Sequence, residues 1–374
     1  MGQLENKKDS SSGATAKKVL LVTTELAAGQ SSALLKDLET LRPDIHVEFL
    51  DKRPFDELPP GLLENTRYLL GFSNFPAPEQ VPNLEWVQLF SAGVNHMLNH
   101  PLWKWKVDEV KWCNASGVGG IIIGEYVVLA ILAHLHRYLS GIESFQGTGH
   151  WPKAWPHLPE QRELYGQTVG IVGYGAIGRN IANLLTRFNV NIITLNSTVK
   201  KTPEDRRGRE EYTPAGTGDI PGDIPSKWYS SNEPKEKHEF FQQSDVVVVT
   251  APYTPATKHL VDAKALKAMK NTALIVNIAR GELIDQDALV KALQKNEIGG
   301  AALDVFTPEP YPDDGAFLTE FNGTEWRDKV LLTPHVSGHS NRYNERVLEI
   351  TEKNLERLEK GQTLLNLLDR RKGY

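Results

Sequence analysis

The amino-acid sequence predicts an α/β protein of two domains, each built around a parallel sheet. The chain has 374 residues, which is about the length of two domains. Short apolar runs recur along it, separated by stretches long enough for helices, and this alternation is typical of parallel strands. A glycine-rich motif within residues 168–185 lies between one apolar run and a helical pattern. These observations together indicate the fold class.

The smaller predicted domain begins at residue 18. Its expected strands are the short apolar runs at residues 18–22, 46–50, 67–72, 84–90 and 110–113. A helix is expected between the first two runs, over residues 32–41. The polar residues 1–17 lack the apolar core of a secretory signal, and we expect them to form a disordered tail.

Residues 121–140 are apolar almost throughout and predict a long helix. A helix that is apolar nearly all round is buried on most sides, either in the core or against a second subunit. Tryptophan and proline crowd the next stretch, residues 149–159, so we expect an arm or loop there.

A motif of the form G-x-G-x-x-G opens the next strand–turn–helix unit. Gly173 permits a tight turn, and Gly175 has no side chain that would keep a pyrophosphate from the backbone. Gly178 lets the following helix pack closely on the strand. Backbone N–H groups at the start of that helix, including those of Ala176 and Ile177, are expected to bind phosphate oxygens. The motif therefore predicts a dinucleotide-binding site.

A second, larger parallel sheet is predicted around this unit. Its expected strands are the apolar runs at residues 191–195, 245–250, 272–278, 300–305 and 329–333. Helices are expected over residues 285–296 and 341–360. Residues 200–234 are rich in proline, glycine and charge, and we interpret them as a solvated surface insertion.

Composition and charge argue against several classes of function. The net charge of −5 and the lack of a basic stripe argue against a nucleic-acid partner. No apolar run reaches the ~18 residues of a membrane span, so no membrane partner is expected. Cys113 is the only cysteine, which excludes an intrachain disulfide and favours a cytoplasmic location. We expect no metal site.

Three polar residues each follow one of the late predicted strands. Arg280 lies after the run 272–278, Glu309 lies beyond the run 300–305, and His335 follows the run 329–333. Ligands of open parallel sheets bind beyond the carboxyl ends of the strands, so we expect all three side chains to face one crevice.

In these motifs the sequence closely resembles the D-isomer-specific 2-hydroxyacid dehydrogenase family, from about Val19 to Lys360. The blocks that carry the resemblance are SAGVNH (91–96), GYGAIG (173–178), NIARGELID (277–285), GAALDVFTPEP (300–310) and TPHVSG (333–338). Several blocks in the same order are far more specific than the glycine motif alone. The N-terminal tail and residues 200–234 lie outside the resemblance.

The resemblance implies two Rossmann-like or flavodoxin-like parallel-sheet domains. A dinucleotide-binding domain, residues 121–337, would be inserted into a substrate-binding domain made of residues 18–120 and 338–374. The family also implies a homodimer through the cofactor domain, which fits the apolar helix at residues 121–140.

The resemblance also implies roles for individual residues. His335 matches the general acid/base, a role suited to an imidazole, and Glu309 matches the carboxylate that orients the ring and favours its protonated form. Arg280 matches the residue that holds the small 2-keto or 2-hydroxy acid with its planar donor fork. The backbone N–H groups of Ala92 and Gly93 would receive the substrate carboxylate.

Further matches concern the edges of the site. Asp304 matches an acidic residue near the nicotinamide amide, although it could instead cap a helix. Asn95 stands where the family usually has Asp, which leaves the choice of substrate open. Trp155, or Trp151 beside it, resembles a tryptophan that some family reductases lend to the neighbouring subunit.

The end of the second cofactor-domain strand bears on the choice between NADP(H) and NAD(H). NAD-specific members usually have Asp there, and this chain has Asn196 followed by Ser197 and Thr198. Lys200 and Lys201 come next. A neutral end followed by hydroxyls and cations suits a 2′-phosphate, so NADP(H) is favoured and a site that accepts both cofactors is the alternative.

Three functions remain in view. The first is reduction of glyoxylate or hydroxypyruvate by a cytoplasmic, NADP(H)-preferring 2-hydroxyacid dehydrogenase. The second is formate dehydrogenase, whose sites pair the histidine with Gln, so Glu309 argues against it. The third is a corepressor-like NAD(H)-sensing binding protein on the same fold. The lack of a nuclear-localisation block and of a long C-terminal extension argues against that reading.

Overall fold

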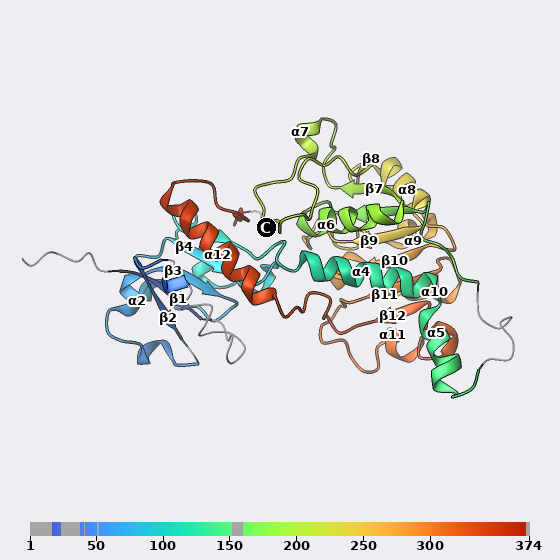
Figure 1. Cartoon of the computed structure of the whole chain (residues 1–374), viewed down its shortest axis with the longest axis horizontal. Helices are drawn as coiled ribbons and strands as arrows, with labels where there is room; N and C mark the ends of the chain where they lie inside the picture. The colour runs from blue at the N-terminus through green and yellow to red at the C-terminus, as the bar shows by residue number, and fades with distance from the viewer. Residues whose placement is uncertain (1–16, 24–37, 41, 51, 152–159, 372–374) are drawn as a thin grey trace, which may run out of the picture. The chain divides into compact units, whose positions relative to one another are not determined.

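The computed structural model describes residues 17–23, 38–40, 42–50, 52–151 and 160–371 (Figure 1). The chain divides into two compact units. The first contains Met1–Phe90 and Asn95–Cys113, and the second contains Ser91–Val94 and Asn114–Lys372. Each is built on a parallel sheet, which confirms the predicted fold class. The domain boundaries implied by the family resemblance stay a prediction.

The first unit holds a five-stranded sheet in the order β2-β1-β3-β4-β5, with every neighbouring pair parallel. The strands are β1 (Lys18–Val22), β2 (Ile45–Phe49), β3 (Thr66–Gly71), β4 (Trp86–Leu89) and β5 (Lys111–Cys113). The bounds of each strand differ by at most two residues from those of an apolar run predicted as a strand, which confirms those five predictions. Two short α-helices are described, α2 (Leu62–Asn65) and α3 (Pro101–Lys104). Most of the helix expected over residues 32–41 lies outside the described residues, although residues 38–40 are helical.

The second unit holds a seven-stranded parallel sheet in the order β12-β11-β10-β9-β6-β7-β8. Its strands are β6 (Thr168–Val172), β7 (Asn191–Asn196), β8 (Lys227–Ser230), β9 (Val246–Val249), β10 (Leu274–Asn277), β11 (Gly300–Leu303) and β12 (Val330–Leu332). Its helices are α4 (Gly120–Leu135), α5 (Tyr138–Ile142), α6 (Ala176–Leu185), α7 (Pro203–Arg206), α8 (Pro234–Gln243), α9 (Ala263–Ala268), α10 (Gln286–Gln294), α11 (Ala316–Thr319) and α12 (Tyr343–Glu359).

Both faces of this sheet are covered, as the sequence of its central strand requires. All four valines of β9 are fully buried. Because side chains alternate along a strand, Val246 and Val248 join a core with α4 and α6, whereas Val247 and Val249 join a core with α8, α9 and α10. A strand buried on both faces reads as a continuous apolar run rather than an alternating one.

The long helix expected over residues 121–140 is wrong in one respect, because the helix breaks in the middle. Helix α4 ends at Leu135, and Arg137 adopts a left-handed backbone with φ of 52° before α5 begins. The carboxylate of Asp328 accepts the N–H groups of Leu139 and Ser140 at 3.0 and 3.3 Å, so it satisfies donors in the first turn of the second helix. The new helix start therefore depends on a residue far along the chain.

The interpretation of residues 200–234 as a solvated insertion is wrong in part, although many of these residues are exposed. These residues include strand β8 at the edge of the sheet, together with the buried side chains of Tyr212 and Asp219. The Asp219 carboxylate accepts hydrogen bonds from the N–H groups of Gly222, Asp223 and Ile224. A turn rich in glycine and charge can be folded inward because this carboxylate satisfies its backbone donors.

No single helix among the described residues combines the length and the apolar composition that crossing a bilayer requires. Helix α4 and residues 138–147 reach that threshold only as a pair, and the pair is bent by 64°.

Candidate active site

Three adjacent strands of the second unit end beside the three polar residues selected from the sequence. Strands β10, β11 and β12 are neighbours in parallel register. Arg280 follows β10, Glu309 lies in the segment after β11, and His335 follows β12. The carboxyl ends of parallel strands share one edge of a sheet, so the fold brings the three residues to the same edge.

His335 and Glu309 form a direct pair at this edge. The imidazole Nδ1 lies 2.7 Å from Glu309 Oε2. The other carboxylate oxygen, Oε1, accepts the backbone N–H of Phe306 at 2.9 Å, which fixes the orientation of the carboxyl group. The His335 side chain is 48% exposed, and its Nε2 has no hydrogen-bond partner among the described residues. The ring is therefore held at one nitrogen and presents the other outward.

The turn that carries His335 is held from below by Asp304, which is fully buried. Its Oδ1 accepts hydrogen bonds from Thr333 Oγ1 at 2.6 Å and Val336 N at 2.9 Å. Its Oδ2 accepts a hydrogen bond from Ser337 N at 3.0 Å. These three hydrogen bonds replace those that the carboxylate would make with water, and so offset the cost of burying its charge. Asp304 thus acts on His335 by fixing the turn on both sides of it.

Two positioning residues at this turn were not found by sequence reasoning. Thr333 Oγ1 lies 2.7 Å from the hydroxyl of Tyr126, which lies on α4 and whose pKa is raised by burial. A chain of hydrogen bonds therefore runs from α4 through Thr333 to Asp304 beneath His335. The TPHVSG block signalled that the turn matters, but Tyr126 is 207 positions away and carried no signal of its own.

Arg280 begins the short 3-10 turn Gly281–Leu283 and is partly buried. Its Nη1 donates to the Ala279 carbonyl at 2.6 Å, and its own carbonyl accepts from Asn277 Nδ2 at 3.0 Å. Asn277, the last residue of β10, also accepts the Ala279 N–H at 3.1 Å. The strand end is thereby folded into a fixed loop that positions the guanidinium.

The glycine motif has the geometry of a dinucleotide-binding turn. Gly173 adopts φ of +90°, and a Cβ there would lie 2.7 Å from the Ala251 backbone. A Cβ on Gly178 would lie 2.5 Å from the Gly173 carbonyl oxygen, so only glycine allows helix α6 to approach β6 this closely. Gly175 is exposed and faces open space. These residues fit a bound pyrophosphate, as Ala176 and Ile177 open the first turn of α6.

The end of β7 lies directly beside this turn. Asn196 Oδ1 accepts the N–H of Tyr174 at 3.2 Å, and its Nδ2 donates to Thr194 Oγ1 at 3.2 Å. The carbonyl of Ser197 accepts from Asn232 Nδ2 at 2.6 Å, and Thr198 is exposed. The side chain of Asn196 therefore links the strand end to the glycine motif.

Basic side chains follow the end of β7. Lys200 is partly buried and Lys201 is exposed. Arg206 on the short helix α7 donates to the carbonyls of both lysines, at 3.3 and 3.4 Å. The predicted 2′-phosphate residues are thus neighbours on one ordered loop.

The loop expected to receive a carboxylate contains Ala92 and Gly93. The Ala92 carbonyl accepts from Asn114 Nδ2 at 2.8 Å, and the Gly93 carbonyl accepts from Ser91 Oγ at 2.7 Å. Among the residues that the structure describes, no backbone hydrogen bond uses the N–H groups of Ala92 and Gly93. The loop thus keeps two donors available for an anion.

The structure describes two of the three residues named at the edges of the site, Trp151 and Asn95. Trp155 lies outside the described residues. Trp151 is 69% exposed and contacts Phe145 edge-on, with the ring centroids 5.4 Å apart. Asn95 is exposed at the start of a 3-10 turn.

Comparison with known proteins places these features in a family. Residues 129–215 and 225–337, more than half of the chain, match the family model described as D-isomer specific 2-hydroxyacid dehydrogenase, NAD binding domain. The matched ranges leave out residues 216–224, which lie between β7 and β8.

Two relatives with similar sequences are both named glyoxylate reductase. The one from Pyrococcus furiosus is 34% identical over 244 residues, and the matched region spans 63% of this chain and 63% of that protein. The one from Thermofilum pendens is 32% identical over 285 residues, which are 76% of this chain and 74% of that protein.

A solved structure shows the same architecture. It is a D-isomer specific 2-hydroxyacid dehydrogenase from Xanthobacter autotrophicus Py2 in complex with NADPH and MES. It superposes with a TM-score of 0.73 at 25% identity, covering 96% of this chain and 100% of that one.

Proposed function

Because this chain belongs to the D-isomer specific 2-hydroxyacid dehydrogenase family, we propose that it reduces a small 2-keto acid with NADPH. The observation that carries the proposal is the His335–Glu309 pair, joined at 2.7 Å beside the strand end that bears Arg280. A proton donor, its carboxylate partner and an anion-binding cation at one sheet edge are the groups that carbonyl reduction needs.

Each residue of the site has a separate role in the proposed reaction. A nicotinamide bound at the glycine motif would supply the hydride. His335, held at Nδ1 by Glu309, donates a proton from Nε2 to the keto oxygen as that oxygen becomes a hydroxyl. Arg280 holds the substrate's oxygens with its planar donor fork. The N–H groups of Ala92 and Gly93 receive the carboxylate.

The preference for NADPH rests on the end of β7. Asn196 carries no charge to repel a 2′-phosphate, and Lys200 and Lys201 follow on the same loop. The Xanthobacter structure, which is similar over nearly the whole chain, holds NADPH. A site that uses both NADPH and NADH is the alternative that kinetics would distinguish.

The names of the relatives support the proposed substrate class. The few groups that would anchor a substrate, Arg280 and the N–H groups of Ala92 and Gly93, also suit a small acid. Both relatives described above are named glyoxylate reductase. We propose glyoxylate or hydroxypyruvate as the keto acid, and a cytoplasmic location, which agrees with a single cysteine that is fully buried.

We further propose that the enzyme is a homodimer through α4 and α5. Large apolar side chains remain exposed along these helices and the residues after them, namely Leu129, Tyr138, Leu139, Phe145 and Trp151. An apolar surface of this kind marks an interface. Light scattering should give the mass of two chains, and the mass of one chain would contradict this assignment.

A substrate panel tests the proposed function. Purified protein should oxidise NADPH in the presence of glyoxylate or hydroxypyruvate, with a higher kcat/KM than with NADH. Tight NADPH binding without turnover of any 2-keto acid would instead favour a nucleotide-sensing binding protein on the same fold.

A further inference from the structure

The residues between β7 and β8, here called the β7–β8 segment (197–226), begin with the two lysines of the proposed 2′-phosphate site and continue into the short helix α7. Arg206, the last residue of α7, folds back onto these lysines. Its Nε donates to the Lys200 carbonyl at 3.3 Å, and its Nη2 donates to the Lys201 carbonyl at 3.4 Å. One planar guanidinium therefore holds the backbone at both lysines.

The turn between the lysines and Arg206 is closed by hydrogen bonds at the start of α7. Thr202, which directly follows Lys201, accepts the Asp205 N–H with its Oγ1 at 3.2 Å. The Asp205 carboxylate accepts the Thr202 N–H in return, at 3.1 Å. These reciprocal bonds satisfy two backbone donors at the helix start. The lysine backbone is thus fixed by Thr202 at one end and by the Arg206 side chain along its length.

The end of α7 is anchored in turn to α6. Arg179 on α6 is buried, and its guanidinium donates to the Asp219 carbonyl and, at 2.6 Å, to the Arg206 carbonyl. Asn183, one turn further along α6, donates from Nδ2 to the Gly218 carbonyl at 2.9 Å. Residues four apart lie on one face of a helix, so one face of α6 holds the backbone of the segment at both places.

The glycine motif adds a further anchor through Tyr174. The Tyr174 hydroxyl donates to the Asp219 carboxylate at 2.7 Å, and its ring centre lies 4.8 Å from the Arg179 guanidinium. Its backbone N–H donates to Asn196 Oδ1 at the end of β7, at 3.2 Å. Tyr174 therefore joins the glycine motif, the end of β7 and the β7–β8 segment.

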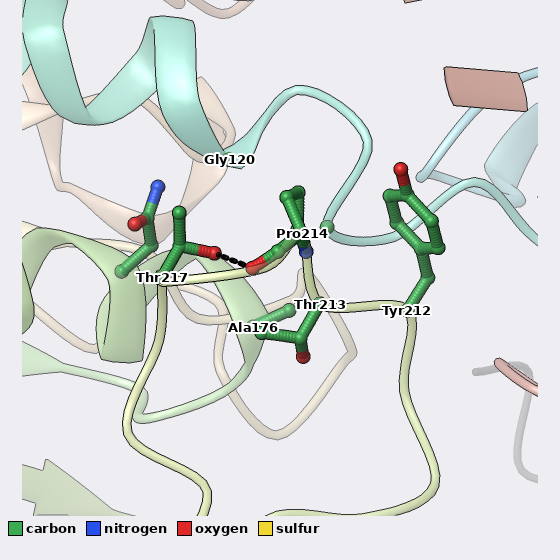
Figure 2. A pocket seen from close by; sticks show the side chains of 8 residues that line it. Gly120, Ala176, Tyr212, Thr213, Pro214 and Thr217 are labelled. Carbon is green, nitrogen blue, oxygen red and sulfur yellow. Dashed lines mark hydrogen bonds between the residues drawn. The ribbon is translucent and has the colours of Figure 1, made fainter. Parts of the chain in front are cut away.

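The middle of the segment packs against the first residue of α6, Ala176. Figure 2 shows the residues of the segment that surround a small cavity there, namely Tyr212, Thr213, Pro214 and Thr217. The volume of the cavity is about 10 Å³, which is room for about one water. Thr217 Oγ1 donates to the Pro214 carbonyl at 2.7 Å and closes a turn beside the cavity. This part of the segment is therefore a closely packed support rather than a site for a ligand.

We propose that Arg206 is a positioning residue for NADPH: it fixes the loop that carries Lys200 and Lys201, and α6 holds Arg206 in place. A pyrophosphate is common to NADPH and NADH, whereas the 2′-phosphate belongs to NADPH alone. A loop that is already fixed loses less conformational freedom when the phosphate binds, so its cations bind more tightly. Because the Arg206 side chain acts on this loop, its effect falls on NADPH and spares NADH. This inference rests on the proposed use of NADPH.

The test compares the dissociation constants for NADPH and NADH of the wild type, Arg206→Gln and the control Arg207→Gln. Both variants lose one positive charge at adjacent positions, but Arg207 is exposed and the two hydrogen bonds to the lysine carbonyls come from Arg206. Arg206→Gln should bind NADPH about tenfold more weakly and NADH as before, whereas Arg207→Gln should bind both like the wild type. An unchanged NADPH constant in Arg206→Gln, an equal loss for both cofactors, or an equal loss in both variants would overturn the inference.

Arg206→Lys separates positioning from charge. Lysine keeps the positive charge, but its single ammonium cannot replace the planar fork that reaches both carbonyls. The NADPH dissociation constant of Arg206→Lys should therefore lie closer to that of Arg206→Gln than to that of the wild type. Full wild-type affinity in Arg206→Lys would show that the charge alone matters and would overturn the positioning role.

Limited proteolysis without cofactor measures the loop directly. An endoproteinase that cuts after lysine can act at Lys200 or Lys201 only when the loop opens, so the cleavage rate reports how firmly the loop is held. Cleavage there should be several-fold faster in Arg206→Gln than in the wild type and unchanged in Arg207→Gln. Equal rates in all three proteins would overturn the inference.

The outcomes also separate this inference from the proposed function. A selective loss of NADPH binding in Arg206→Gln, without turnover of any keto acid by the wild type, would leave the inference standing and contradict only the proposed function. A wild type that reduces a keto acid but binds NADPH and NADH equally would overturn the inference and keep the proposed reduction.

Discussion

At the scale of single residues, the site depends on a histidine fixed at one nitrogen and open at the other. Glu309 contacts Nδ1 of His335 at 2.7 Å, while Asp304 ties down the turn through Thr333, Val336 and Ser337. The roles predicted for His335 and Glu309 follow from residue type and position after a strand. The role of Asp304 beneath the turn could not be predicted, since it depends on contacts across about 30 positions of chain.

Replacing Glu309 with Gln should change the pH dependence of catalysis. Gln removes the negative charge that lies 2.7 Å from Nδ1, and that charge favours the protonated ring. The alkaline limb of the reductive kcat/KM profile and the acidic limb of the oxidative profile should both move to lower pH. Glu297→Gln, a change in the exposed loop before β11, should leave both limbs in place. Unmoved limbs in Glu309→Gln would show that Glu309 is not the electrostatic partner.

Replacing Asn196 with Asp should reverse the cofactor preference. Asp keeps an acceptor for the Tyr174 N–H, adds a charge that repels a 2′-phosphate, and can bind the ribose hydroxyls of NADH. The ratio of kcat/KM for NADPH over NADH should fall by about tenfold or more, since a charge-assisted hydrogen bond contributes ~1.5–3 kcal/mol. Asn189→Asp, which adds the same charge before β7 begins, should not alter the ratio. A ratio that is equally insensitive to both substitutions would refute the assignment.

At the scale of elements, the glycine motif and the ends of the strands were predictable from the sequence. The break between α4 and α5 and the edge strand β8 were not. The β6–α6 unit and β10 to β12 have strong local patterns, since buried strands and helix starts are encoded by neighbouring residues. The break between α4 and α5 depends on Asp328, which lies far along the chain. Its carboxylate accepts the N–H of Leu139 at the start of α5. Strand β8 was missed because its four residues, KWYS, lie among polar and glycine-rich sequence.

Helix α4 also carries a buried histidine that makes stability depend on pH. His134 is fully buried, with Nδ1 2.6 Å from the Asp328 carbonyl, and burial lowers its pKa to about 4. The unfolded chain binds this proton near pH 6.5, so the stabilisation present above that pH is lost as pH falls toward 4. The loss should reach about 2 kcal/mol at pH 5.

Urea unfolding at pH 7 and pH 5 measures this effect. His134→Gln can still donate to the Asp328 carbonyl but does not titrate, so it should lose less stability than the wild type on acidification. His238→Gln, at an exposed position on α8, is the control and should behave like the wild type. An equal loss in the wild type and in His134→Gln would exclude His134 as the source.

At the scale of the whole molecule, the chain combines two parallel-sheet units. The second unit carries both the glycine motif and the His335–Glu309 pair. The sequence predicted this because strand-end residues and the glycine motif obey rules that hold for any open parallel sheet. It did not predict that the residues between β7 and β8 fold back onto α6, where Arg179 donates to the carbonyls of Arg206 and Asp219. That arrangement depends on two contacts between residues far apart in sequence, Tyr174 with Asp219 and Tyr212 with Asn366, and no local pattern encodes them.

The most direct test of the central claim is the kinetics of His335→Ala with NADPH and glyoxylate or hydroxypyruvate. If His335 donates the proton to the keto oxygen, kcat/KM should fall by about 10²–10⁴-fold, the usual contribution of a general acid. The NADPH dissociation constant should stay the same, because the glycine motif is untouched. A variant that reduces the keto acid as fast as the wild type would contradict the account.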